Sequence, residues 1–95
     1  MPTPPSWLEW DDDKAERNRR KHGVSFALAE RFPFETALEA HDPESDDHGE
    51  DRYLAIGKID RTFYALCYTL RGEKIRVISL RKATAEERRR YREGG

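Results

Sequence analysis

Arginine and lysine side chains dominate the part of this sequence that is best suited to chemistry. In the segment 73–81, EKIRVISLR, Lys74 and Arg76 alternate with apolar residues, and Arg52 opens an earlier segment of similar type. Such alternation is typical of a β-strand, in which every second side chain lies on the same face. A guanidinium group binds phosphate oxygens in bidentate geometry, so cations gathered on one face of a sheet indicate a site for a phosphate-bearing polyanion.

A second basic element follows at the C-terminus. It comprises Arg81, Lys82, Arg88, Arg89, Arg90 and Arg92. Such a run on a terminal helix is either a solvated face or a surface that contacts the backbone of a nucleic acid. Because the run follows a strand that already carries cations, the interpretation as a backbone-binding surface gains support. The candidate nucleic-acid contacts are Lys74, Arg61 and Arg88.

The dipeptide Lys21-His22 supplies groups that could transfer protons. An imidazole exchanges protons near neutral pH, which makes His22 a candidate general acid or base. The alternative is a structural histidine beside Asn18 on the same helix. Lys21 could contact a phosphate, or it could only interact with the negative end of the helix dipole. The residues alone leave both alternatives open.

The formal net charge of −1 conceals a strong asymmetry along the chain. Residues 35–51 contain eight acidic residues and no lysine or arginine, whereas residues 52–95 contain twelve basic residues and five acidic ones. A basic surface attracts polyanions through its local field, so this separation indicates a binding function. The acidic segment is either a solvated loop or a shield that limits unspecific association.

Composition places the chain among small, highly charged domains. Of its 95 residues, 39% are charged and only 36% are hydrophobic. We therefore expect one domain with a thin core, or a core that a partner completes. The expected organisation is a disordered leader at 1–6, a single domain at 7–92 and a tail at 93–95. No apolar run reaches the roughly 18 residues of a membrane-spanning helix, so we expect no membrane association.

Cysteine and histidine usage argues against disulfides and metal sites. Cys67 is the single cysteine, which rules out an internal disulfide and fits a reducing cytoplasm. We expect it to be a buried, inert thiol. The groups His41-Asp42 and Asp46-Asp47-His48 match no zinc or calcium pattern, so we expect no metal and no other cofactor.

Caps and turns predict the element order β-α-α-β-β-β-β-α. A helix at residues 12–22 has Asp11 as its N-cap and Gly23 as its C-cap, and shorter helices begin after Ser25 and after Thr84. Strands are expected at residues 8–10, 34–40, 52–59, 62–70 and 73–81. The fold class is therefore α+β: an antiparallel sheet, made of a four-strand meander and a short N-terminal strand, packs with two N-terminal helices and a short C-terminal helix.

Two-residue turns at 60–61 and 71–72 would fix the register of the last three strands. In that register three cations share one face of the sheet: Arg52, Lys74 and Arg76. Arg81 lies on the opposite face. The alternative to an anion site is that carboxylates of the same chain neutralise the three cations; the candidates are Glu50, Asp51 and Glu73.

Two ordered blocks of residues resemble the BrnT family of bacterial toxins. The first, WDDDKAERNRRKHGVSFALAERF, contains Trp10-Asp11, Lys14, Asn18 and the run KHGVSF at 21–26. The second, residues 50–91, contains Arg52, Ile56-Gly57, Tyr68-Thr69, Arg71-Gly72, Ile75-Arg76, Ser79, Arg81 and Ala83. The resemblance covers about residues 8–91, and the leader before Trp7 is extra. It implies a RelE-like fold, in which a small antiparallel sheet packs against helices.

The resemblance also implies an activity and a partner. A toxin of this type cleaves RNA, inhibits translation and growth, and is neutralised by a cognate ribbon-helix-helix antitoxin. The complex would contact operator DNA only through the antitoxin, which we expect to cover apolar surface around Trp7, Trp10 or Phe34. The competing interpretations are a non-catalytic module that binds nucleic acid or an acidic protein segment, and an inactive member of a regulatory complex.

Metal-independent RNA cleavage assigns a role to each candidate. A base takes the proton of the 2′-OH, cations stabilise the charged phosphate, and an acid protonates the leaving 5′-oxygen. We assign the phosphate to Arg52, Arg76 and Arg81. The candidate proton carriers are Lys21 and His22, with Glu50 in reserve.

Overall fold

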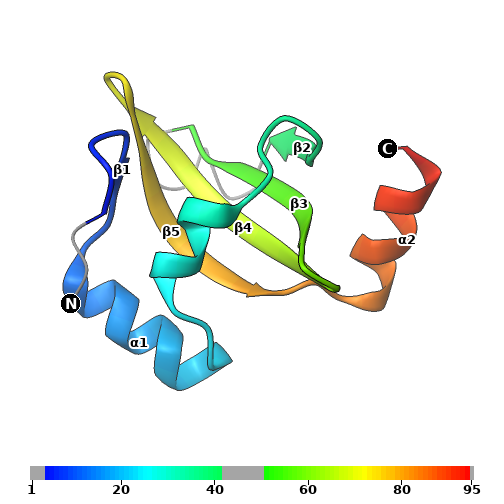
Figure 1. Ribbon diagram of the computed structural model, residues 1–95, viewed down its shortest axis with the longest axis horizontal. Helices are drawn as coiled ribbons and strands as arrows, with labels where there is room; N and C mark the ends of the chain where they lie inside the picture. Colours follow the sequence, from blue (N-terminus) through cyan, green and yellow to red (C-terminus); the bar gives the residue numbers. More distant parts are fainter. Residues whose placement is uncertain (1–3, 42–50, 95) are drawn as a thin grey trace.

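The computed structural model describes residues 4–41 and 51–94 as a small α+β domain built on one five-stranded sheet (Figure 1). In chain order the elements are β1 (Leu8–Glu9), α1 (Asp12–His22), the 3₁₀-helix η1 (Phe26–Arg31), β2 (Leu38–His41), β3 (Tyr53–Ile59), β4 (Thr62–Arg71), β5 (Lys74–Lys82) and α2 (Ala85–Glu93). Most of the predicted acidic loop, residues 42–50, lies outside the described part. No helix in the described ranges is long and apolar enough to cross a bilayer.

The sheet is mixed, with strand order β1-β5-β4-β3-β2. Strands β2 to β5 form the predicted antiparallel meander. The prediction of a purely antiparallel sheet is wrong, because β1 pairs with β5 in parallel, Leu8 opposite Ile75. Tight turns force the strands of the meander to alternate in direction, but no such turn joins β1 to β5, so their relative direction is not restricted in this way.

The register of β3 and β4 is as predicted, but that of β4 and β5 is not. The turn between β4 and β5 is Gly72-Glu73, with φ of 61° at Gly72, instead of Arg71-Gly72. A glycine with positive φ at the first central position is typical of a type II′ hairpin. A β-bulge follows: Tyr68 pairs with Val77 but Cys67 pairs with Ser79, which leaves Ile78 as the extra residue.

Local signals explain the helices. In α1, Asp11 Oδ1 accepts hydrogen bonds from Asp13 N (2.8 Å) and Lys14 N (3.1 Å), and Gly23 closes the helix with φ of 71°, as predicted. The predicted second N-terminal helix is a single six-residue 3₁₀-helix, η1. Short lengths are usual for this helix type, and Pro33 stops it from extending.

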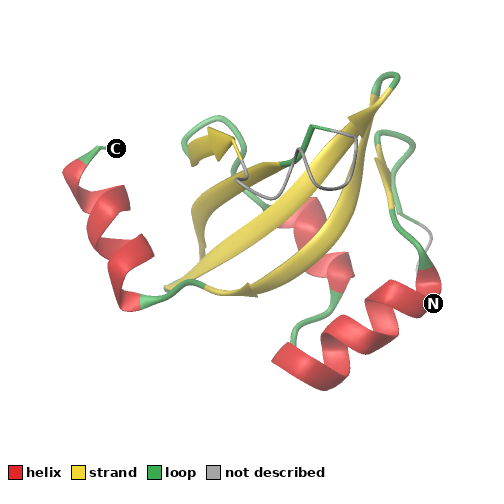
Figure 2. Cartoon of the chain, turned by 180° about the vertical axis from the view of Figure 1, so that it is seen from behind, coloured by secondary structure: helices red, strands yellow, loops and turns green. Residues whose placement is uncertain are grey.

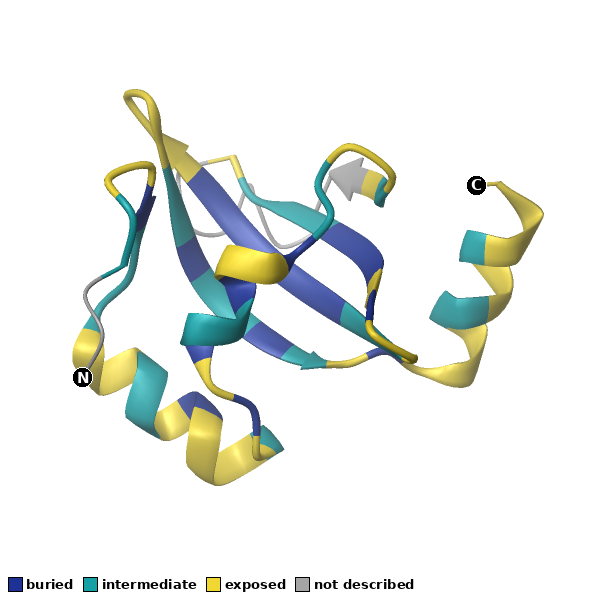
Figure 3. Ribbon diagram, viewed as in Figure 1, coloured by how far each residue is buried: buried dark blue, intermediate teal, exposed yellow. Residues whose placement is uncertain are grey.

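The core lies between one face of the sheet and η1, together with the segment that joins α1 to η1 (Figures 1 and 3). The largest fully buried side chains are Phe26, Leu66, Val77 and Leu80. Gly57 is needed because a Cβ there would lie only 2.9 Å from the Phe32 ring.

Asn18 fixes α1 to the sheet, because the helix has almost no apolar face. Its side chain is buried at the outer edge of β5, where Nδ2 donates to Leu80 O (2.7 Å) and Oδ1 accepts from Leu80 N (3.1 Å). Nδ2 also donates to Val24 O (3.1 Å), just after the helix. The amide thus supplies the hydrogen bonds that a neighbouring strand would otherwise provide.

We expect Asn18→Ala to lower the free energy of unfolding by about 3 kcal/mol, because buried backbone groups of Leu80 and Val24 lose their partners. Urea unfolding followed by circular dichroism measures this change. Arg20→Ala, at an exposed position of the same helix, should cost no more than about 0.5 kcal/mol. Equal stability of the two variants would show that Asn18 does not hold the helix.

Candidate functional site

Figure 2 views the sheet from the side opposite η1. The strand pairing places predicted cations on this face, which is called here the arginine face. Arg76 pairs with Thr69 and Arg81 pairs with Ala65, so both project from the same face. In the β3–β4 ladder Tyr53 pairs with Tyr68, so the next pair would be Arg52 with Thr69. Cross-strand partners share a face, so Arg52 also lies on the arginine face. The prediction that Arg81 lies on the opposite face is therefore wrong, because the bulge at Ile78 inverts the alternation along β5.

A shallow depression lies between α1 and the arginine face, with a volume of about 290 Å³. Its lining residues are Lys14, Arg17, Asn18, Lys21, His22, Arg52, Ile78 and Ser79. Three of the predicted site residues, Lys21, His22 and Arg52, thus meet although thirty positions separate His22 from Arg52. Apart from His22, every ionisable group in the lining is a cation, which favours an anionic ligand.

Lys14 and Arg17 belong to the site but were not predicted for it. Together with Lys21 they follow the spacing i, i+3, i+7, which places them on one side of the helix. This spacing was visible in the sequence. What the sequence did not show is which side of α1 turns toward the sheet, because no apolar stripe marks it.

His22 has the character of a proton acceptor. It is half-buried, and burial lowers its pKa, with further lowering by the positive charges of Lys21 and Arg81. Within the described parts of the chain no hydrogen bond to its ring is found, and the neighbouring Asn18 bonds to Val24 and Leu80 instead. The lowered pKa favours the neutral ring, which is the form that can accept a proton.

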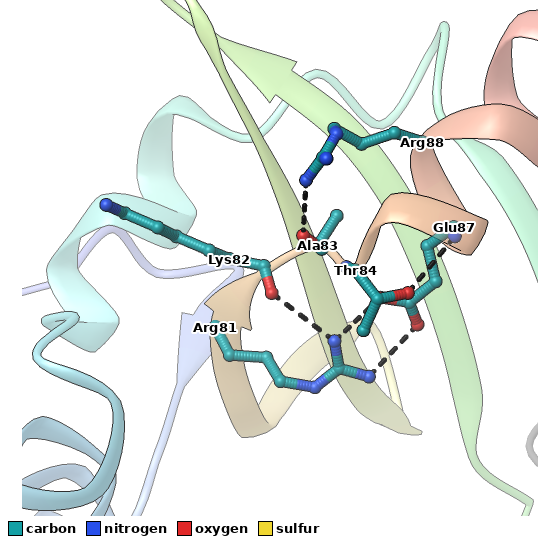
Figure 4. Close-up of polar contacts among 6 residues, drawn as sticks. All are labelled: Arg81, Lys82, Ala83, Thr84, Glu87 and Arg88. Atoms are coloured by element: carbon teal, nitrogen blue, oxygen red, sulfur yellow. Dashed lines mark hydrogen bonds and ion pairs between the residues drawn. The ribbon is translucent and has the colours of Figure 1, made fainter.

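Arg76 and Arg81 are each held by a carboxylate. Arg76 Nη1 donates to Glu9 Oε2 of β1 (2.8 Å), and both side chains are largely buried. Arg81 Nη1 and Nη2 donate to the two carboxylate oxygens of Glu87 (2.7 and 3.0 Å; Figure 4). These partners come from β1 and α2, not from the acidic loop or Glu73. The two guanidinium groups are consequently fixed in place and partly neutralised.

Glu87 has a second function in the same cluster. Its Oε1 also accepts from Thr84 N (2.8 Å), while Thr84 Oγ1 accepts from Glu87 N (3.1 Å), which completes the predicted capping box of α2 (Figure 4). The hydrogen bonds from Arg81 are the main cause of the lowered pKa of Glu87. The position of Arg81 is thereby coupled to the first turn of α2.

The candidate nucleic-acid contacts do not gather at the depression. Lys74 lies beside the β4–β5 turn and Arg61 in the β3–β4 turn, at opposite ends of β4. Arg88 donates to Ala83 O (3.1 Å) at the start of α2. Their assignment remains a prediction, and the reserve base Glu50 lies outside the described residues.

The described ranges contain no group of three or more metal-ligating side chains. The predicted buried thiol, Cys67, is indeed buried. Among residues 4–41 and 51–94, the large apolar side chains that are exposed are Trp7 (39%) and Leu70 (56%). Trp7 stacks edge-on against Phe34 with ring centroids 6.1 Å apart, so an apolar area does lie near the predicted partner-binding residues.

We expect Glu87→Gln to destabilise the protein by about 1 kcal/mol at pH 7, because Arg81 loses an ionic partner. The folded-state pKa of Glu87 is lowered, so this contribution is present above about pH 4.5 and is lost as the pH falls through the folded value. Chemical denaturation at pH 7 and well below pH 4.5 measures it. Glu86→Gln is the control, since Glu86 makes only exposed pairs at 3.8 and 4.0 Å; a constant difference across pH for Glu87→Gln would contradict the expectation.

Comparison of the sequence with known families gives a match to one family model. The model described as "Ribonuclease toxin, BrnT, of type II toxin-antitoxin system" matches residues 10–87, which include α1, η1, the whole meander and the capping box of α2. Comparison with curated proteins and with solved structures gave no match. All residues that line the depression lie inside the matched range. The chain therefore belongs to the BrnT family of ribonuclease toxins of type II toxin–antitoxin systems, which implies an antitoxin partner.

Proposed function

We propose that this chain is a metal-independent endoribonuclease that cleaves RNA by attack of the 2′-OH on the adjacent phosphate, within the depression between α1 and the arginine face. The observation that carries this proposal is that the half-buried His22, whose pKa burial lowers, lines one depression with the cations Lys21 and Arg52. The reaction requires a proton acceptor next to a cationic phosphate site. Family membership supplies the ribonuclease class.

Each group in the depression has a step to perform. His22 accepts the proton of the 2′-OH as its oxygen bonds to phosphorus. Arg52 donates hydrogen bonds to the phosphate oxygens as negative charge develops on them. The bond from phosphorus to the 5′-oxygen breaks, and Lys21 gives that oxygen a proton. The products are a 2′,3′-cyclic phosphate and a 5′-hydroxyl, and proton transfer is balanced between His22 and Lys21.

Arg76 and Arg81 support the site from its sheet side. A guanidinium has five N–H donors, and among the described residues Arg76 donates only Nη1 to Glu9, which leaves donors for a phosphate. Arg81 commits both Nη atoms to Glu87, so its contribution is the positive charge that lowers the pKa of His22. We therefore propose Arg76 as a phosphate contact and Arg81 as a positioning and electrostatic residue.

The proposal extends to partners and cellular effect. The fold is taken to be RelE-like, the antitoxin to be of the ribbon-helix-helix type, and RNA cleavage to inhibit translation and growth in the cytoplasm. The exposed Trp7 and the neighbouring Phe34 offer the antitoxin an apolar contact. Operator DNA would be contacted through the antitoxin alone.

We expect His22→Ala and Arg52→Ala each to slow RNA cleavage by about 10²–10³-fold and to restore growth to cells that express the toxin. Cleavage of a defined RNA in EDTA measures the rate, and the matching DNA should stay intact because it lacks the 2′-OH. Arg31→Ala is the control, since Arg31 pairs with Asp60 (2.7 Å) away from the depression. Full toxicity of both site variants would refute the assignment, and wild-type protein that binds but never cleaves RNA would support the non-catalytic interpretation.

The pH dependence of cleavage provides an independent check. His22 must be neutral to accept a proton, and its pKa is lowered from 6.5 by burial, by Lys21 and by Arg81. The rate should therefore rise with pH and level off below pH 6.5, with any decline at high pH due to another group. Arg81→Gln should move this acidic limb to higher pH. An unchanged limb would show that another group is the base.

A further inference from the structure

We propose that Lys14 and Arg17, which lie in one row with Lys21 on α1, bind successive phosphates of the RNA strand next to the scissile one, so that the strand runs along α1. This inference rests on the proposed function for the position of the scissile phosphate, at the His22 end of the row. It adds Lys14 and Arg17 as substrate-binding residues. The ligand class is a single strand of RNA, bound through its backbone.

The geometry of the helix supports a linear track. Lys14 and Lys21 are separated by seven residues, which is about 10 Å along the axis at a rise of about 1.5 Å per residue. Arg17 lies between them, and all three line the depression. This places cations at intervals comparable with the separation of neighbouring phosphates in an extended strand, with the last cation beside His22.

The cations of α1 fall into two groups, those that form ion pairs and those that do not. Arg19 and Arg20 both bind Glu16, at 2.6 and 3.1 Å. Lys14, Arg17 and Lys21 form no ion pair within the described parts of the chain, although they lie on the same short helix. Among the described residues, Asp11 is a carboxylate that interacts with the row: its pKa is lowered mainly by the hydrogen bond from Lys14 N and further by the charges of Arg76 and Arg17.

Unpaired cations in a row repel one another, and the bound phosphates would remove this repulsion. Asp11 is already committed as the N-cap of α1 through Asp13 N and Lys14 N. It cannot neutralise three side chains spread over two turns of helix. The structure thus keeps this row of charges available, whereas it neutralises the other arginines of the same helix.

The test measures binding of a fully 2′-O-methylated RNA oligonucleotide, which cannot be cleaved, as a function of salt concentration. Each lost phosphate contact reduces the slope of log affinity against log salt by about 0.7 for a single strand, so Lys14→Gln/Arg17→Gln should reduce it by about 1.4. The matched control is Arg19→Gln/Arg20→Gln, which removes the same charge from the same helix and should leave the slope at the wild-type value. Circular dichroism confirms that both variants are folded.

Equal slopes for the two double variants, whether both are reduced or both unchanged, would overturn the proposed track. Failure of the proposed track can be distinguished from failure of the proposed function. If wild-type protein cleaves unmodified RNA but the slopes are equal, only the track is wrong. If wild-type protein cleaves nothing but the slopes differ as expected, the track stands as a nucleic-acid surface and the catalytic assignment is wrong.

Discussion

The site depends on one interaction, the pair of hydrogen bonds between the side-chain amide of Asn18 and the backbone of Leu80. Helix α1 carries too few apolar residues to be held by burial alone, and β1 covers only the other end of β5. The amide bonds to the N–H and C=O groups of Leu80, which β1 does not reach. These bonds set both the position and the rotation of the helix. That rotation turns Lys21 and His22 toward Arg52, which comes from a distant part of the chain.

The second constraint is the distribution of charge over the arginine face. A concentration of cations on a small sheet would be unfavourable in the free protein, and two carboxylates reduce this cost. Glu9 and Glu87 hold Arg76 and Arg81, and each anchors an arginine to a neighbouring element. Lys14, Arg17 and Lys21 of α1, together with His22, line the depression and remain open to a ligand. This separation of paired arginines from unpaired cations suits a protein that folds in the absence of RNA and still attracts it.

Much of the fold could be predicted because its signals are local. Asp11 and Gly23 bound α1, Thr84 and Glu87 cap α2, and the turn at Asp60-Arg61 gave the register of β3 with β4 correctly. The face of Arg81 could not be predicted, because a bulge at Ile78 leaves no mark in an apolar run. Nor could the hairpin shift at Gly72, since one glycine fits either position of a two-residue turn until the pairing is known.

The candidate site was predictable in its residue types but only partly in its arrangement. Lys21, His22 and Arg52 were identified and do lie together, while Arg76 and Arg81 proved to be paired with Glu9 and Glu87. Those pairs join residues 67 and 6 positions apart. The longer-range pair depends on β1 lying beside β5, a contact between distant segments that no local pattern reports.

The chemistry is tested most directly by the ends of the RNA fragments that the purified protein produces in EDTA. Attack by the 2′-OH, assisted by His22 and Arg52, leaves a 2′,3′-cyclic phosphate, or the 3′-phosphate formed by its hydrolysis, and a 5′-hydroxyl on the downstream fragment. Fragments that carry 5′-phosphate and 3′-hydroxyl ends, or cleavage that stops when divalent cations are removed, would contradict this account.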